Sequence, residues 1–168
     1  MAYEFLPPGP TPEPLSFSHF PDRMSCFIFR NWNMVPVATM AKLLGTTSAK
    51  ILRIAQFMGL PKYEAGQTKF WKTKGYISLI RQNWHLLPYE QILEMLGMSE
   101  KELAVCLKED DFLYHKLGAL KPAAKVLKYE EPTEETIARL KEIRTELCAD
   151  LLKESKNFET RIPKYFMT

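Results

Sequence analysis

The sequence predicts an all-α fold in which two tandem helix-turn-helix-like units, each of three helices, are closed by a long C-terminal amphipathic helix. Three observations lead to this prediction. A stretch of the chain occurs twice, each copy has the start and stop signals of two short helices, and apolar residues recur at helical spacing near the C-terminus.

The repeat relates residues 31–61 (NWNMVPVATMAKLLGTTSAKILRIAQFMGLP) to residues 83–113 (NWHLLPYEQILEMLGMSEKELAVCLKEDDFL) at a constant offset of 52. Five pairs are identical: Asn31 and Asn83, Trp32 and Trp84, Pro36 and Pro88, Leu44 and Leu96, and Gly45 and Gly97. Two tryptophans and two prolines rarely recur in one register by chance, so we interpret this as an internal repeat. We expect its structural core to contain Trp32, Trp84, Pro36, Pro88, Gly45 and Gly97.

Each copy has the local signals of a helix, a glycine turn and a second helix. Pro36 and Pro88 suit the first turn of a helix, where no N–H group is needed. Gly45 and Gly97 can adopt the left-handed conformation that ends a helix. Thr47 and Ser99 then suit the N-cap of the next helix, and Ser99 with Glu102 forms a capping box.

The N-terminal arm, residues 1–21, contains six of the twelve prolines and favours an extended polyproline conformation. It is either an ordinary arm or an SH3-type ligand, and Phe5, Leu6, Phe17 and Phe20 suggest that parts of it lie on the domain. The first unit and a basic loop follow at 22–73. Residues 26–29 and 76–80 are predicted as the first helix of each unit, with a short strand as the alternative. The polar loop 62–73 could form a small hairpin.

The second unit and an irregular connection occupy residues 74–131, with residues 114–117 ending a helix at Gly118. Residues 132–160 form the C-terminal helix, which Thr133 caps and acidic residues begin. Its apolar residues lie at spacings of three and four, so one face packs on a partner: Ile137, Leu140, Ile143, Leu147 and Leu151. Residues 161–168 (RIPKYFMT) are aromatic and apolar, and we interpret them as a linker toward a following domain.

Composition excludes several classes of protein. The net charge of +3 is too small to imply a polyanionic partner by itself. Cys26, Cys106 and Cys148 lack CxxC or zinc-like spacing, which predicts buried free thiols in a reducing compartment. No apolar run is long enough to span a membrane, and the N-terminus lacks the features of a signal peptide. We therefore expect a cytoplasmic protein without a membrane partner.

The sequence offers few candidates for catalysis. We expect His85 to be a partly buried structural histidine, because it follows Trp84. Asp111 and His115, four residues apart, could hold a hard metal, but a solvated surface is the simpler interpretation. The chain has no phosphate-cradling glycine loop, nucleophile elbow or HExxH motif. We accordingly predict no catalytic residue, metal, cofactor or small-molecule ligand.

Nucleic-acid binding would depend on the first unit, in which Lys50, Arg53 and Gln56 are expected to face outward from the second helix of the motif. Between Lys50 and Arg81 seven basic residues, Lys69, Lys72 and Lys74 among them, stand against Glu64 alone, a charge typical of a phosphate-contacting patch. The second unit is acidic at 89–113. Its helix is apolar over residues 103–107, which predicts burial on several sides.

Two strings carry a resemblance to a known group: FRNWNMVPVATMAKLLG and KGYISLIRQNWHLLPYEQILEMLGMSEKELAVCLKEDDFLYHKLG. They resemble the N-terminal helical region of large bacterial proteins whose later part is similar to family-20-type glycoside hydrolases. The resemblance covers residues 22–156, and it departs from the group's pattern at Lys108, which begins KEDDFL where REDDFL is expected. It implies a non-catalytic accessory or interaction module whose partner is another domain of the same polypeptide. The alternative is the DNA-binding helix-turn-helix domain of a transcription regulator, acting through the first unit.

Overall fold

The computed structural model describes residues 3–7 and 9–161, with side chains as far as residue 149. The described part is helical and contains no strand, which confirms the all-α prediction. The helices are α1 (Arg23–Asn31), α2 (Val37–Leu44), α3 (Ser48–Phe57), the 3-10 turn η1 (Ala65–Gln67), α4 (Thr68–Thr73), α5 (Tyr76–Asn83), α6 (Tyr89–Leu96), α7 (Glu100–Glu109), α8 (Leu113–Lys116) and α9 (Glu134–Arg161). The strand alternatives for 26–29 and 76–80 are therefore wrong, and so is the hairpin at 62–73.

The helix bounds follow the sequence repeat: α2 and α6, like α3 and α7, begin and end at positions related by the same offset. Gly45 and Gly97 end their helices with φ values of 66° and 63°. The capping box of Ser99 and Glu102 is present. Pro36 and Pro88 lie at the N-cap, one position before the predicted first turn. That the two units are equivalent three-helix folds stays a prediction, since it depends on superposing their backbones.

Two helices of the first unit contact the helices at the equivalent positions of the second unit: α1 contacts α5, and α2 contacts α6. At the first of these contacts Asn31 and Asn83, both fully buried, pair their amides reciprocally. Asn31 Nδ2 lies 2.8 Å from Asn83 Oδ1, and Asn83 Nδ2 lies 2.7 Å from Asn31 Oδ1. Each Nδ2 also donates to the carbonyl four residues earlier, and Gln82 Nε2 donates to Asn31 Oδ1 at 2.9 Å. The pair joins the units through hydrogen bonds that satisfy both buried amides.

The two repeated tryptophans occupy matching positions but differ in burial. Each directly follows the first helix of its unit and donates its indole N–H to a backbone carbonyl, of Pro61 for Trp32 and of Leu120 for Trp84. Trp84 is completely buried, whereas Trp32 is partly exposed. The segment after the second unit covers Trp84, while Trp32 packs its edge on Tyr63.

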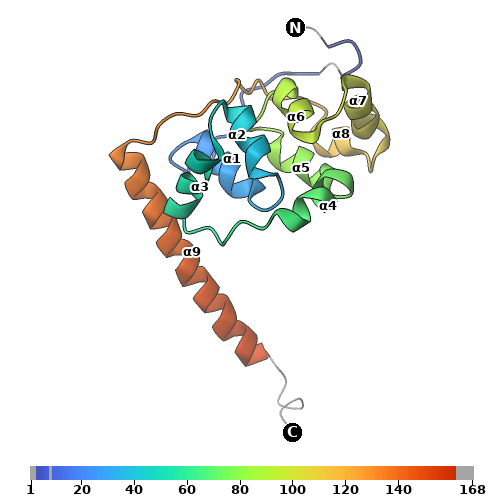
Figure 1. Ribbon diagram of the computed structural model, residues 1–168. Helices are drawn as coiled ribbons and strands as arrows, with labels where there is room; N and C mark the ends of the chain where they lie inside the picture. Colours follow the sequence, from blue (N-terminus) through green and yellow to red (C-terminus); the bar gives the residue numbers. More distant parts are fainter. Residues whose placement is uncertain (1–2, 8, 162–168) are drawn as a thin grey trace.

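The N-terminal arm lies on the domain, as its apolar residues predicted: Leu6 is buried, and Phe5, Phe17 and Phe20 are partly buried against the core. Part of the arm runs beside residues 121–123 (Figure 1). The carbonyls of Pro10 and Pro12 accept hydrogen bonds from Lys121 N and Ala123 N at 3.1 and 2.9 Å. Because proline has no N–H group to return, the pairing is one-sided and no strand forms.

Farther along, the arm is bound by His85, which is partly exposed and whose Nδ1 accepts the Leu15 N–H at 3.2 Å. Burial, and then the charges of Lys121 and Arg30, hold the pKa of His85 below 6.5. Protonation would remove the acceptor. Because the pKa of His85 is lower in the folded chain than in the unfolded chain, the unfolded chain binds the proton more readily. The hydrogen bond therefore stabilises the fold fully above pH 6.5, and this stabilisation is lost as the pH falls through the pKa of His85 in the folded chain.

We therefore expect the Leu15 amide resonance to titrate as the pH is lowered from 7.5 toward 4.5, as the arm detaches. His85→Gln, which keeps an acceptor but does not titrate, is the matched control and should leave that resonance unchanged. A Leu15 amide that is equally insensitive in both proteins would contradict the contact.

The connection, residues 119–131, is irregular as predicted and binds both units. The buried side-chain amide of Gln91 donates to the carbonyls of Leu43 and Leu127 at 2.9 and 2.8 Å, and accepts from Leu127 N at 2.8 Å. Tyr129 N donates to the carbonyl of Leu44 at 2.8 Å. The connection therefore stabilises the contact between α2 and α6.

Helix α9 begins where predicted, after Thr133, whose side chain accepts from Thr136 N. Leu140 and Ile143 are buried and Leu147 is partly buried, so the inner part of the helix packs on the body, where it contacts α3. The rest extends away from the body (Figure 1). The Leu151 side chain, and residues 162–168 of the predicted linker, lie outside what the structure describes.

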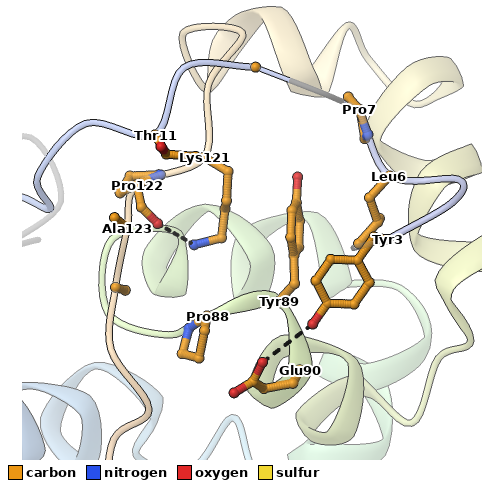
Figure 2. A pocket seen from close by; sticks show the side chains of 12 residues that line it. Tyr3, Leu6, Pro7, Thr11, Pro88, Tyr89, Glu90, Lys121, Pro122 and Ala123 are labelled. Carbon is orange, nitrogen blue, oxygen red and sulfur yellow. Dashed lines mark hydrogen bonds between the residues drawn. The ribbon is translucent and has the colours of Figure 1, made fainter. Parts of the chain in front are cut away.

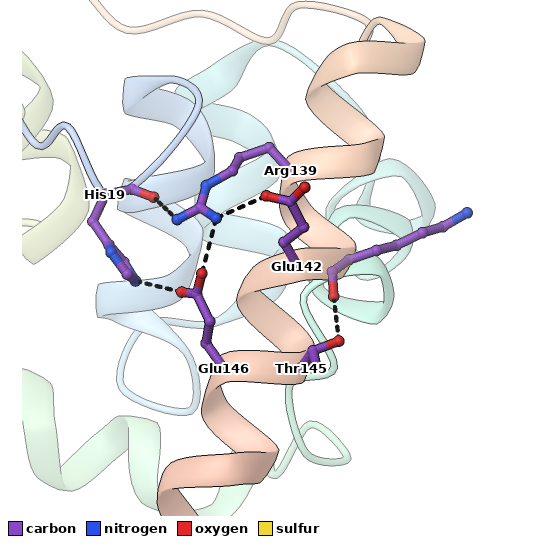
Figure 3. Close-up of polar contacts among 6 residues, drawn as sticks. His19, Arg139, Glu142, Thr145 and Glu146 are labelled. Atoms are coloured by element: carbon purple, nitrogen blue, oxygen red, sulfur yellow. Dashed lines mark hydrogen bonds and ion pairs between the residues drawn. The ribbon is translucent and has the colours of Figure 1, made fainter.

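Polar contacts between the arm and α9 add to this packing (Figure 3). Arg139 donates to Glu142 and Glu146, each at 2.9 Å, and to the backbone carbonyl of His19 at 3.2 Å. Glu146 in turn lies 3.3 Å from His19 Nε2. The start of α9 is thus tied to the end of the arm.

Candidate functional site

The groups considered for catalysis or metal binding are engaged elsewhere or lie apart. The described residues contain no group of three or more His, Cys, Asp or Glu that could hold a metal. Asp111 pairs with Lys116 at 2.6 Å, so its carboxylate is not directed to His115. All three cysteines are free thiols, but Cys148 is exposed, so the prediction of buried thiols is wrong for that residue. Within the described residues no helix is both long enough and apolar enough to cross a membrane.

The outward face of α3 is exposed, as the DNA-binding alternative requires, but its cations are paired. Lys50 Nζ lies 3.1 Å from Glu131 Oε2, and Arg53 pairs with the other oxygen of the same carboxylate. Lys50 also stands 4.7 Å from the centre of the Tyr129 ring. The end of the connection therefore offsets one of the two positive charges of α3.

Gln56, the third residue of this face, is exposed and lines a hollow of about 410 Å³ together with Trp32 and Arg144. Arg144 comes from α9, which contacts α3. A helix that reads a major groove needs its outer face free. Part of the outer face of α3 lies against α9 and is therefore not free.

Lys69, Lys72 and Lys74 are exposed, on α4 and directly after it. Within the described part of the chain none of the three has a carboxylate at ion-pair distance. Helix α4 lies against α5 and away from α3 (Figure 1). The structure therefore divides the basic residues of the first unit into a paired set on α3 and an unpaired set at α4.

A surface hollow of about 470 Å³ lies between the end of α4 and α7. We call it the α4–α7 groove, and its lining is Lys72, Thr73, Tyr76, Met98, Lys101, Glu102, Val105 and Cys106. Helix α7 buries Leu103, Ala104 and Leu107, whereas Val105 is 57% exposed. The prediction that this helix is buried on several sides is wrong at Val105, because only one face of α7 packs on the core.

The acidic groups of the α4–α7 groove already have partners. Glu102 Oε2 accepts from the backbone N and the hydroxyl of Ser99 at 2.7 and 2.8 Å, which lowers the pKa of that carboxyl. Tyr76 donates to Asp110 at 2.6 Å, and this hydrogen bond, with burial, raises the pKa of Tyr76 to about 12. Burial likewise raises the pKa of Cys106 to about 11, so its thiol stays protonated at neutral pH.

A third hollow, of about 370 Å³, lies between the arm, the start of α6 and the connection (Figure 2). It contains the buried Lys121, which sequence reasoning missed because nothing in its neighbourhood distinguishes it from a surface lysine. Lys121 Nζ donates to the carbonyls of Trp84 and Leu87, both at 2.8 Å, and of Pro122 at 3.3 Å.

The Lys121 ammonium also stands 5.0 and 5.5 Å from the centres of the Trp84 and Tyr89 rings. Burial, and secondarily Arg23, lowers the pKa of Lys121 to about 8. An ammonium has three N–H donors, and three carbonyls receive them. We therefore assign Lys121 a structural role, in which it satisfies the turn carbonyls between α5 and α6.

Of the surfaces described, the α4–α7 groove combines the exposed side chain of Val105 with lysines that have no carboxylate at ion-pair distance among the described residues, an arrangement suited to binding. No protein-family model matches this chain, and no curated protein or solved structure matches it either.

Proposed function

We propose that this chain is a non-catalytic interaction module that docks another domain of a larger, carbohydrate-active protein through the α4–α7 groove. The observation that carries the proposal is the exposure of Val105 in a hollow that it lines together with Met98 and Tyr76, both partly buried against the core. The carbohydrate-active parent follows from the resemblance of residues 22–156 to the helical region of glycoside-hydrolase-like proteins. The free thiols agree with a cytoplasmic location.

The chemistry of the groove supports docking. Burial of apolar surface contributes about 25 cal/mol per Å², so an uncovered apolar hollow gains stability when a partner covers it. Val105 belongs to a helix whose opposite face is anchored in the core by Leu103 and Leu107, so the surface is held on a rigid element. The arm and α9 cover other parts of the body, so the chain already uses its own segments to bury apolar faces elsewhere.

The proposal is tested by comparing this chain alone with the longest natural reading frame that contains it. We expect the amides of α7 around Val105 to exchange at least about tenfold more slowly in the longer protein, because a docked domain excludes water. Val105→Asp should abolish that difference. Val126→Asp is the matched control, since Val126 is 46% exposed and lies outside the groove. Equal exchange in both proteins, or equal effects of the two substitutions, would refute the docking site.

The second candidate, duplex DNA binding through the first unit, is favoured by one observation: Lys69, Lys72 and Lys74 are exposed and without ion-pair partners among the described residues. Against it, Lys50 and Arg53 both form ion pairs with Glu131, which offsets one of their two positive charges. Our proposal predicts duplex binding no tighter than nonspecific, roughly 10⁻⁴–10⁻⁶ M at physiological salt.

If the first unit did bind DNA sequence-specifically, the double variant Lys50→Ala with Arg53→Ala would bind duplex DNA more weakly. The slope of log K against log salt concentration would fall by about one unit for each phosphate that the variant no longer neutralises. Glu131→Gln would tighten binding in that case, because it frees both cations. Fluorescence anisotropy with duplexes of varied sequence measures these effects. Submicromolar, sequence-selective binding would favour DNA recognition over docking.

A further inference from the structure

We infer that the α4–α7 groove takes an acidic amphipathic peptide segment, whose apolar side chains fill the hollow and whose carboxylates meet Lys72 and Lys101. This inference rests on the proposed function, and it names the chemistry of the docked segment. It is carried by the distribution of charge around an apolar surface.

The acidic residues near the groove are used within the chain. Six of the seven acids between Tyr89 and Leu113 have hydrogen-bond or ion-pair partners: Glu90 with Tyr3, Glu94 with Lys42, Glu100 with Phe5 N and Leu6 N, Glu102 with Ser99, Asp110 with Tyr76, and Asp111 with Lys116. Glu94 and Asp111 are paired with lysines, whereas the other four keep their negative charge and use it to accept hydrogen bonds within the chain. Glu109, at the far end of α7, is the remaining member of this set.

The two lysines of the groove, unlike the paired acids, have no ion-pair partner among the described residues. Across the described residues, neither Lys72 nor Lys101 has a carboxylate within ion-pair distance. The Lys101 ammonium stands 4.7 Å from the centre of the Phe5 ring, a contact that leaves its charge uncompensated. Lys69 lies three residues before Lys72 on α4, a spacing that places both on one helical face. Lys72 and Lys101 thus line the groove from its two helices, and the one carboxylate in the lining, Glu102, is held by Ser99.

This arrangement selects against a nucleic acid. Phosphates on the floor of the groove would lie on Met98 and Val105, which offer them no hydrogen bond. A peptide with apolar side chains on one face and carboxylates beside them matches both parts of the surface. Complementary charge at the rim fixes partner choice and register more than it adds affinity.

The test uses a designed helical peptide with leucine at positions i, i+3, i+4 and i+7 and glutamate at its exposed positions. A second peptide replaces each glutamate by lysine. We expect the acidic peptide to bind the native chain and the basic peptide to bind at least about tenfold more weakly in fluorescence anisotropy at low salt. Lys72→Glu with Lys101→Glu should reverse that preference, because two attractive contacts become repulsive.

Lys74→Glu with Lys125→Glu is the matched control, since it makes the same change of net charge at exposed positions outside the groove. A preference that the control pair reverses as well would show only long-range attraction and overturn the inference. A site-specific readout is the amide resonance of Cys106, which lines the groove and should shift when the acidic peptide binds. The amide resonance of Cys148 on α9 is the internal reference, and equal shifts at both residues would also overturn the inference.

The outcomes separate this inference from the proposed function. If α7 is protected in the longer protein but neither Lys72→Glu nor Lys101→Glu affects that protection and the acidic peptide does not bind, the groove docks a partner of other chemistry. If α7 gains no protection and the acidic peptide still binds at Cys106, the groove is real but its partner is not a neighbouring domain. Preferential binding of duplex DNA or of anionic vesicles at the groove would overturn the peptide assignment.

Discussion

Replacing Trp84 by alanine should lower the free energy of unfolding by about 3–5 kcal/mol. The ring is completely buried, packs its edge on Tyr89, and lies under the Lys121 ammonium, so its removal leaves a cavity with no solvent access. It also leaves the carbonyl of Leu120 without the indole donor. Chemical denaturation monitored by circular dichroism measures the loss.

Trp32→Ala is the matched control, because Trp32 holds the equivalent position of the repeat but is partly exposed. Its removal should destabilise the chain less than the removal of Trp84, since water can fill part of the space. Equal losses at the two positions would contradict the difference in burial. An unchanged melt for Trp84→Ala would place the core elsewhere.

Asn31→Ala is expected to destabilise the chain by about 2–4 kcal/mol, because it deletes hydrogen bonds and also leaves buried polar groups without a hydrogen-bond partner. Asn83 would lose both hydrogen bonds with the Asn31 amide, and Gln82 would lose its acceptor. Asn83→Ala should be less harmful, since Gln82 still donates to Asn31 in that variant.

The double variant provides the sharper measurement. With both amides removed neither one leaves the other unpaired at the contact between α1 and α5, so the combined loss should fall short of the sum by about 1–2 kcal/mol. Strictly additive losses in urea denaturation would mean that the two amides do not interact, and would contradict the reciprocal pair.

The local signals in the sequence predicted most of the helices. Gly45, Gly97, Thr47, Ser99 and Thr133 act within one helical turn of their own position, so their effects can be inferred without knowing the rest of the fold. The segment 62–73 was misjudged because its helix is short and its aromatic residues interrupt the polar pattern. The exposure of Val105 depends on which face of α7 meets the core, and apolar residues on adjacent positions do not reveal that face.

The features that depend on long-range contacts could not be predicted. The role of Lys121 arises only because the arm, the connection and the turn after Trp84 converge on it. The sequence did single out Lys50 and Arg53, but their partner Glu131 lies in a segment with no regular structure. The α4–α7 groove likewise joins residues from two units, and its charge becomes visible only when the internal partners of the acids are known.

The reciprocal amide pair also bears on how copies of the chain could associate. In an isologous interface residue i of one copy contacts residue j of the other, and j contacts i in return. Here Asn31 and Asn83 make a reciprocal contact of this kind within one chain. Such a contact can be made equally well between molecules. If the segment between α3 and α4 were to straighten, the first unit of one copy could pair with the second unit of another and recreate the same hydrogen bonds. The length and stiffness of residues 58–67 therefore set whether this contact closes within a monomer or produces a domain-swapped dimer.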